Sequence, residues 1–213
     1  MKYGILFDLD GTLWDASRTV APAWNEVMAA EGLTVTPQIM RTMMGKTLAQ
    51  IGAAMLPRCS AARQKELTDA CSVLECERLL RDGADLYPAV EHTLRELKKN
   101  CFLAVVSNCQ IAYMDAFLRH YRFDALFDDH LCAGDTGKSK GENIAAVVRR
   151  AGLDRAVYVG DTQSDLDAAD AAGTDFIWAA YGFGSTDRDT EKIAAFAELP
   201  AAAARIFGGQ DGV

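Results

Sequence analysis

The chain has 213 residues, half of them hydrophobic, and a formal net charge of −8 at pH 7. This length and apolar content allow a sizeable core and exclude a disordered chain. The negative net charge argues against nucleic-acid and membrane-surface partners, because those bind proteins with a basic face. It does not argue against a small anionic substrate, because one metal ion and one lysine can reverse the charge locally.

The six cysteines include no Cys-x-x-Cys pair, and no two of the three histidines have the spacing of metal ligands. In a chain of this length, such a pattern is typical of a reduced, cytoplasmic protein with buried thiols. The N-terminus runs directly into an apolar segment, so we expect no secretory signal. No apolar stretch reaches the ~18 residues that a membrane span needs. We therefore predict a cytoplasmic protein.

The first predicted element is a buried strand, Tyr3–Phe7, and it ends in an unusual pair of charges. Asp8 and Asp10 follow it, and Gly11 and Thr12 come next. Alternate residues of an extended chain point to the same side, so the two carboxylates are neighbours. Placing like charges side by side at the end of a buried strand costs free energy. The pair therefore indicates a bound divalent cation or acid–base chemistry.

Residues 16–84 contain no convincing strand and predict an all-helical insert. Thr36, before a proline, is typical of a helix start and Gly45 of a helix end. Ser60 is expected to cap a long helix that ends near Gly83. The insert leaves the sheet just after the first carboxylate pair, and ligands of α/β proteins bind at such strand ends. We therefore expect a lid over an active site rather than a surface decoration.

Apolar runs and helical stripes alternate in the rest of the chain. Three runs have the pattern of buried parallel strands: Phe102–Val106, Ala156–Val159 and Phe176–Ala180. A shorter strand is expected near His130–Ala133. A helical stripe follows Pro88, and two others end at Gly152 and Gly173. The alanine-rich residues 194–206 predict a terminal helix, followed by a frayed Gly-Gly-Gln-Asp-Gly-Val end.

This order of elements predicts an α/β fold, a doubly wound, Rossmann-like parallel sheet with an inserted all-helical cap domain. The predicted boundaries place residues 1–15 and 85–213 in the α/β core and residues 16–84 in the cap.

Polar side chains follow the later strands at their carboxyl ends. Ser107 and Asn108 follow the second strand, and Asp161 and Asp165 follow the third. Residues 137–141, which include two lysines, stand just before a helix start. The carboxyl ends of parallel strands share one edge, so we expect these side chains to meet the first carboxylate pair in one crevice. Several carboxylate oxygens together suit Mg²⁺, which also binds substrate phosphate.

Four motifs thus stand in order along the chain: residues 8–12, Ser107-Asn108, a lysine at 138 or 140, and Asp161 with Asp165. With them the chain resembles the haloacid dehalogenase-like superfamily of phosphohydrolases, over essentially its whole length. A helical insert between the first two motifs is similar to the subgroup with a helical-bundle cap, which includes phosphoglycolate phosphatase-like enzymes.

The resemblance implies a Mg²⁺-dependent phosphatase that acts on a small phosphorylated metabolite. It implies that Asp8 is the nucleophile and forms an aspartyl phosphate, and that Asp10 protonates the leaving oxygen and then takes a proton from water. Ser107 and a lysine would hold the phosphoryl oxygens. The implied metal ligands are Asp8, the Asp10 carbonyl and Asp161. Asp165 would orient the metal shell.

The resemblance leaves the lysine open. Many relatives carry the motif Lys-Pro-x-Pro before this helix. If the same distance to the helix is assumed here, the matching lysine is Lys138. Those prolines are absent here, and Gly141 follows Lys140, as in relatives with Lys-Gly directly before the helix. We therefore favour Lys140 as the catalytic lysine and keep Lys138, with Thr12 and Asn108, as a second-rank phosphate neighbour.

Other functions fit the pattern less well. Residues 134–139 imitate the end of a nucleotide-binding P-loop, but Cys132 stands where that pattern requires glycine. A dehalogenase has no need of Asp10. A binding or regulatory relative without activity is expected to lose a motif carboxylate, and Asp8, Asp10 and Asp161 are all present. A phosphosugar mutase of the same superfamily stays open.

Two loops have two interpretations each. Residues 45–47, Gly-Lys-Thr, either reach into the active site or form a plain turn between helices. Residues 181–184, Tyr-Gly-Phe-Gly, either shape the rim of the crevice or form a rigid turn.

The sequence does not identify the phosphomonoester, nor does it distinguish a monomer from a homodimer.

Overall fold

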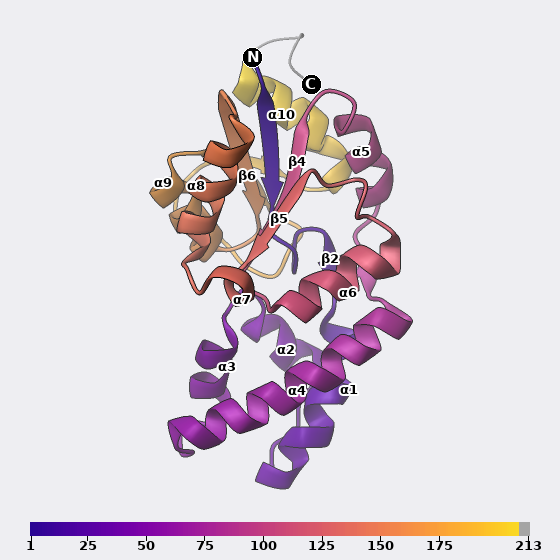
Figure 1. Cartoon of the computed structure of the whole chain (residues 1–213), viewed down its shortest axis with the longest axis vertical. Coiled ribbons are helices and arrows are strands. Elements are labelled where there is room, and N and C mark those ends of the chain that lie inside the picture. Colours follow the sequence, from indigo (N-terminus) through magenta and orange to yellow (C-terminus); the bar gives the residue numbers. More distant parts are fainter. Residues whose placement is uncertain (209–213) are drawn as a thin grey trace.

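A six-stranded parallel sheet is the centre of the α/β part (Figure 1). The computed structural model describes residues 1–208. The strands are β1 (Tyr3–Phe7), β4 (Phe102–Ser107), β5 (Asp129–Cys132), β6 (Arg155–Gly160), β7 (Asp175–Ala179) and β8 (Glu191–Ile193). Their order is β5-β4-β1-β6-β7-β8. The chain starts in the middle and winds outward to both edges, which confirms the predicted doubly wound α/β fold.

The five predicted strands correspond to β1, β4, β5, β6 and β7. The sixth, β8, was not expected, because only Ile193 of its three residues is buried and no apolar run marks it. The prediction of a terminal helix over residues 194–206 was wrong at its start. Residues 194–195 are not helical, and a 3₁₀ turn, Phe196–Glu198, precedes α10 (Leu199–Phe207). The predicted frayed end falls mainly on residues 209–213, outside the described residues.

Helices cover both faces of the sheet. Besides α10 they are α5 (Val90–Leu97), α6 (Ile111–Tyr121), α7 (Ala133–Thr136), α8 (Lys140–Ala151) and α9 (Gln163–Ala172). Successive residues of β1 point to opposite faces. Leu6 packs in one apolar cluster with side chains of α8 and α9, and Ile5 and Phe7 pack in the other with α5, α6 and α10. The helix predicted to start at Pro88 begins at Val90.

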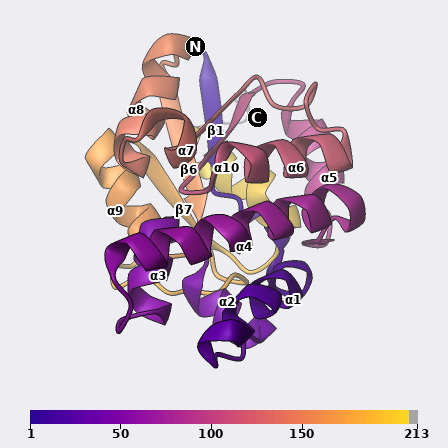
Figure 2. The ribbon, with the colours of Figure 1, turned by 60° about the horizontal axis from the view of Figure 1, so that its bottom comes forward.

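A helical segment of four helices lies between the first and second strands of this sheet. It consists of α1 (Ser17–Met28), α2 (Pro37–Met43), α3 (Leu48–Met55) and α4 (Ala61–Asp82), with a 3₁₀ turn at Ala29–Glu31. Thr36 caps α2, Ser60 caps α4, and α4 ends at Gly83, as predicted. Figures 1 and 2 show α1–α4 lying across the carboxyl end of the sheet. Within residues 1–208, no helix has both the length and the apolar character for crossing a membrane.

The chain crosses between the sheet and the helical segment twice, and the two crossings pair with each other. β2 (Trp14–Asp15) and β3 (Asp85–Leu86) are antiparallel, with Trp14 opposite Leu86 and Asp15 opposite Asp85. Strands of two residues carry no readable alternation, so the sequence did not predict them. The pair lies at the predicted domain boundaries, which themselves stay a prediction.

Candidate functional site

Three carboxylates come together at the carboxyl edge of the sheet. Asp8 directly follows β1, Asp161 directly follows β6, and Asp165 lies in the first turn of α9. Each offers a side-chain oxygen within 4.8 Å of those offered by the other two, and all three residues are buried. The topology of the parallel sheet therefore places side by side residues that are far apart in the sequence.

Lys140, the first residue of α8, contacts two of these carboxylates. Its Nζ lies 2.9 Å from Asp8 Oδ1 and 2.6 Å from Asp165 Oδ1, and the residue is only 4% exposed. Burial disfavours the ammonium ion, but the carboxylates of Asp165 and Asp8 outweigh it and raise the pKa of Lys140 above its ordinary value. Lys138 is exposed in the bend before α8. Of the two candidate lysines, the structure thus places Lys140 at the cluster.

Asp165 is fixed by the start of α9. Its Oδ2 accepts hydrogen bonds from the Asp161 N–H at 3.2 Å, the Thr162 N–H at 3.0 Å and the Thr162 hydroxyl at 2.7 Å. Thr162 is the N-cap of α9, and the reciprocal bonds form a capping box. One oxygen of Asp165 is thus bound to the helix start and the other to Lys140, so Asp165 positions both the lysine and Asp161.

Two oxygens of the cluster, Asp8 Oδ2 and Asp161 Oδ1, are buried without a hydrogen-bond partner among residues 1–208. Burial raises the pKa of Asp8 to about 6, although Lys140 opposes the shift. Burial and the repulsion of Asp165 and Asp8 raise the pKa of Asp161 to about 8. Buried carboxylate oxygens without a donor cost free energy unless a cation compensates them. The donor set therefore fits a hard divalent cation with oxygen ligands, such as Mg²⁺.

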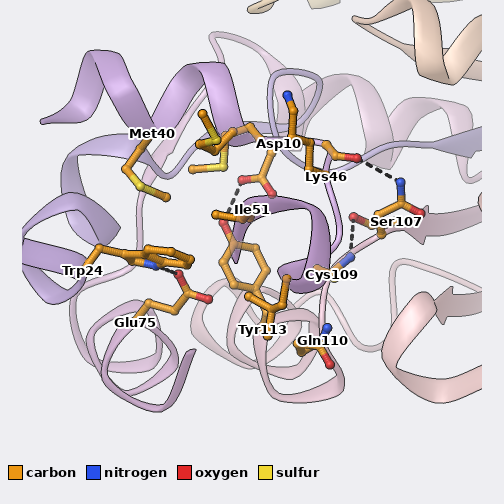
Figure 3. Close-up of a pocket in the computed structure, with 15 residues that line it drawn as sticks. Asp10, Trp24, Met40, Lys46, Ile51, Glu75, Ser107, Cys109, Gln110 and Tyr113 are labelled. Carbon is orange, nitrogen blue, oxygen red and sulfur yellow. Dashed lines mark hydrogen bonds between the residues drawn. The ribbon is translucent and has the colours of Figure 1, made fainter. Parts of the chain in front are cut away.

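Asp10 has hydrogen-bond partners of its own. Its Oδ1 accepts from the Tyr113 hydroxyl at 2.7 Å (Figure 3) and from Trp14 Nε1 at 2.9 Å. Burial raises the pKa of Asp10 to about 7, and the charge of Asp8 adds to the shift while the two hydrogen bonds oppose it. A carboxyl that titrates near neutrality can both give and take a proton. The sequence did not single out Trp14 or Tyr113, because an aromatic residue in an apolar stretch has the pattern of an ordinary core residue.

The loop after β7 packs directly against Asp161. The Phe183 N–H donates a hydrogen bond to Asp161 Oδ2 at 2.7 Å. Gly182 has no room for a side chain, since a Cβ atom there would lie 2.3 Å from Asp161 Cβ and 2.4 Å from the Gly11 carbonyl oxygen. The loop therefore fixes the position of Asp161, a contact that neither interpretation of residues 181–184 included.

The three other predicted phosphate neighbours at this edge differ in their contacts. The Ser107 hydroxyl, buried at the end of β4, accepts a hydrogen bond from the Cys109 N–H at 3.3 Å. The Thr12 hydroxyl is buried and has no partner among the described residues. Asn108 Nδ2 donates to the Gly45 carbonyl at 2.9 Å. Asn108 therefore joins the sheet edge to the helical segment, and its phosphate contact stays a prediction.

A narrow cavity of about 40 Å³ lies between the sheet edge and the helical segment (Figure 3). Its lining includes Asp10, Ser107 and Tyr113 on the sheet side and Trp24, Lys46 and Glu75 on the helical side. Gly45 lines it as well. The loop of residues 45–47 therefore reaches the cavity, which favours the first of its two interpretations. The sheet and the helical segment share one pocket.

Comparison with known proteins gives one consistent relationship. A family model described as haloacid dehalogenase-like hydrolase matches residues 5–179. A phosphoglycolate phosphatase of Mesorhizobium japonicum is 32% identical over 208 residues, which are 89% of this chain and 86% of that protein.

Two solved structures share the fold. CbbY from Rhodobacter sphaeroides, in complex with phosphate, has a TM-score of 0.77 at 24% identity, and the match covers 100% of this chain and 99% of that one. A haloacid dehalogenase-like family hydrolase from Streptococcus pneumoniae has a TM-score of 0.78 at 20% identity, over 94% and 98% of the two chains.

Proposed function

Because this chain belongs to the haloacid dehalogenase-like hydrolase family, we propose that it is a Mg²⁺-dependent phosphatase that hydrolyses a small phosphomonoester through an aspartyl-phosphate intermediate. The observation that carries the proposal is the buried group of three carboxylates with Lys140 between two of them. The relative from Mesorhizobium japonicum is named a phosphoglycolate phosphatase, and CbbY was solved with phosphate. Both facts support a small phosphorylated metabolite as the substrate.

Asp8, Asp161 and the Asp10 carbonyl are the groups that would hold Mg²⁺, with Asp165 orienting them. When bound, Mg²⁺ neutralises charge on the phosphoryl oxygens and reduces their repulsion with Asp8. The partnerless oxygens of Asp8 and Asp161 support this assignment, because they are buried acceptors that no described group of the protein satisfies.

Two half-reactions follow from the roles of Asp8 and Asp10. In the first, a carboxylate oxygen of Asp8 forms a bond to phosphorus while the bond from phosphorus to the ester oxygen breaks. Asp10 gives its proton to that ester oxygen, so the product leaves as a neutral alcohol. In the second, the oxygen of a water molecule forms a bond to the phosphorus of the aspartyl phosphate while the bond from phosphorus to the Asp8 oxygen breaks. Asp10 accepts a proton from that water, inorganic phosphate is released and Asp8 returns to a carboxylate. A pKa raised by burial to about 7 supports this double role.

Lys140 and Ser107 are the proposed holders of the transferred group. The ammonium of Lys140 favours the ionised form of Asp8, which is the attacking form, and adds positive charge where phosphoryl oxygens arrive. Thr12 and Asn108 are second-rank neighbours. Lys138 is exposed, and we keep it as the alternative to be tested against Lys140.

The helical segment acts as a cap in this proposal, with residues 16–84 as the cap and residues 1–15 and 85–213 as the catalytic core. The position of α1–α4 across the carboxyl end of the sheet (Figure 2) and the shared cavity support this role. Closure of such a cap excludes bulk water during phosphoryl transfer.

The cysteines among residues 1–208 form no disulfide, which supports the expected cytoplasmic location.

A panel of small phosphate esters, assayed with Mg²⁺ and with a chelator, tests the proposal. We expect Mg²⁺-dependent release of inorganic phosphate, and we expect Asp8→Asn to abolish it. Hydrolysis that survives chelation, or near-wild-type turnover of Asp8→Asn, would refute the mechanism. Activity that requires a sugar bisphosphate and returns the phosphoryl group to a sugar would instead identify a phosphosugar mutase.

A further inference from the structure

Glu75 is a buried carboxyl that the proposed mechanism does not use. It lies on α4, is 5% exposed and lines the cavity between the sheet edge and the helical segment. Trp24 Nε1 of α1 donates a hydrogen bond to Glu75 Oε2. Figure 3 shows this carboxyl beside the Trp24 indole, on the helical side of the cavity that Asp10 lines from the sheet side.

The other groups on the helical side of this cavity are apolar or directed elsewhere. Met40 and Ile51 contribute apolar side chains. Lys46 also lines the cavity, but it is exposed and its Nζ donates to the Thr42 carbonyl at 2.7 Å. Among the described lining residues, therefore, no buried cation stands ready to compensate an anion beside Glu75.

We infer that Glu75 selects the leaving alcohol: it accepts a hydrogen bond from a hydroxyl or ammonium group of that alcohol and disfavours a carboxylate in the same place. The inference rests on the proposed function, because Asp10 is there the group that protonates the leaving oxygen. Asp10 and Glu75 line the same cavity, so the alcohol leaves into the space beside Glu75. A carboxylate on the alcohol would lie against the buried carboxyl of Glu75, which costs free energy. A hydroxyl or ammonium group on the alcohol would instead donate a hydrogen bond to Glu75.

The electrostatics of Glu75 make this selection depend on pH. Burial raises the pKa of Glu75 to about 8, while the hydrogen bond from Trp24 opposes the shift and the charge of Asp10 adds to it. A second anion would raise this pKa further, and a donor or cation would stabilise the ionised form. Below that pKa a protonated Glu75 can itself donate to a substrate carboxylate, so the selection applies above about pH 8, where Glu75 is ionised. The test therefore uses that pH range and a variant with a permanent donor at this position.

Short esters probe the space beside Glu75 most simply. Four two-carbon esters make matched probes: ethyl phosphate, 2-hydroxyethyl phosphate, 2-aminoethyl phosphate and carboxymethyl phosphate, which is phosphoglycolate. They differ only in the group that would lie beside Glu75.

The measurement is kcat/KM for each ester at about pH 9, where Glu75 is ionised, expressed as its ratio to that of ethyl phosphate in the same protein. For the wild type we expect the hydroxyl or the ammonium ester to exceed ethyl phosphate by roughly ten- to a hundredfold, the range of a hydrogen bond to a charged group. The carboxymethyl ester is expected to fall below ethyl phosphate. The two donor esters distinguish a polyol-like from an amino-alcohol substrate.

Glu75→Gln is the decisive variant, because its amide keeps an oxygen for Trp24 and turns an N–H donor toward the cavity. The donor esters are expected to lose their advantage, and the carboxymethyl ester to gain on ethyl phosphate. Glu77→Gln, an exposed position on the same helix, is the matched control and should keep the wild-type ratios. Trp24→Phe removes the N–H that orients Glu75 and should weaken the preference for donor esters.

The outcomes separate this inference from the function on which it rests. A wild-type preference for the carboxymethyl ester, equal ratios for all four esters, or wild-type ratios in Glu75→Gln would overturn the inference alone. Hydrolysis of larger phosphomonoesters with none of these four would overturn it as well. If no phosphomonoester is hydrolysed in a Mg²⁺-dependent way, the proposed function itself fails. The wild-type ranking decides the matter even if Glu75→Gln does not fold.

Discussion

Replacing Lys140 by methionine, which keeps the length of the side chain and removes its charge, tests the buried ion pairs most sharply. Lys140 Nζ lies 2.9 Å from Asp8 and 2.6 Å from Asp165, and all three residues are at most 4% exposed. Removing one partner of a buried ion pair costs about 3–5 kcal/mol, because it leaves an uncompensated buried charge. For a chain of this size, that loss corresponds to a Tm lowered by about 6–20 °C.

The effect of Lys140→Met should depend on pH. The pKa of Asp8 is about 6 with the lysine in place and rises further without it. Protonation of Asp8 then relieves the uncompensated charge, so the deficit in Tm should be smaller at pH 6 than at pH 8. Added Mg²⁺ should raise the Tm of Lys140→Met more than that of the wild type, because the cation replaces part of the missing charge.

Thermal unfolding and phosphatase turnover, measured beside the matched variant Lys138→Met, are the assays. We expect turnover of Lys140→Met to fall by roughly a hundredfold or more. Lys138 is exposed, so Lys138→Met should stay within about 0.5 kcal/mol of the wild-type stability and keep most of the activity. A larger loss in Lys138→Met, or an unchanged Tm in Lys140→Met, would refute this account of the cluster.

Three further predictions concern residues around the site. Gly182→Ala drives a Cβ atom against Asp161, so Mg²⁺ affinity measured by calorimetry should fall roughly ten- to a hundredfold, and an unchanged affinity would contradict this. Burial raises the pKa of Glu75 from 4.5 to about 8 on folding, so its ionisation costs stability as the pH rises between those values. The stability of Glu75→Gln relative to the wild type, measured by denaturant unfolding, should therefore increase from about pH 5 to about pH 8 and then stay level, and a difference that is constant with pH would count against it. Arg41→Met breaks the 2.5 Å ion pair between Arg41 on α2 and Asp15. The amide hydrogens of α2 should then exchange with deuterium up to about fivefold faster, and an unchanged exchange rate would show that this ion pair does not stabilise α2.

The sequence predicted the central strands and the motif carboxylates because both leave local marks. A continuous apolar run such as Phe102–Val106 has few structures other than a buried strand. Asp8 and Asp161 each follow such a run directly, and the topology of parallel sheets then brings them to one edge. The short strands escaped prediction because two or three residues carry no alternation, as in β8, where only Ile193 is buried.

The environment of the site depends on contacts between distant segments, and the sequence does not mark those. Tyr113 reaches Asp10 across 103 residues, and Phe183 donates to Asp161 across 22. Glu75 on its long helix has the sequence pattern of a solvated residue, yet the packing of α4 against α1 buries it next to Trp24. In each case the partner is set by tertiary packing, which overrides the local pattern.

The most direct test of the mechanism is to identify the phosphorylated residue during turnover. The protein is mixed with a hydrolysed phosphate ester and Mg²⁺, quenched rapidly in acid, and digested, and the peptides are analysed by mass spectrometry. We predict the added mass of one phosphoryl group on Asp8, present only with Mg²⁺ and absent from Asp8→Asn. A phosphoryl group on another residue, or full turnover by a protein that never carries one at Asp8, would contradict the account.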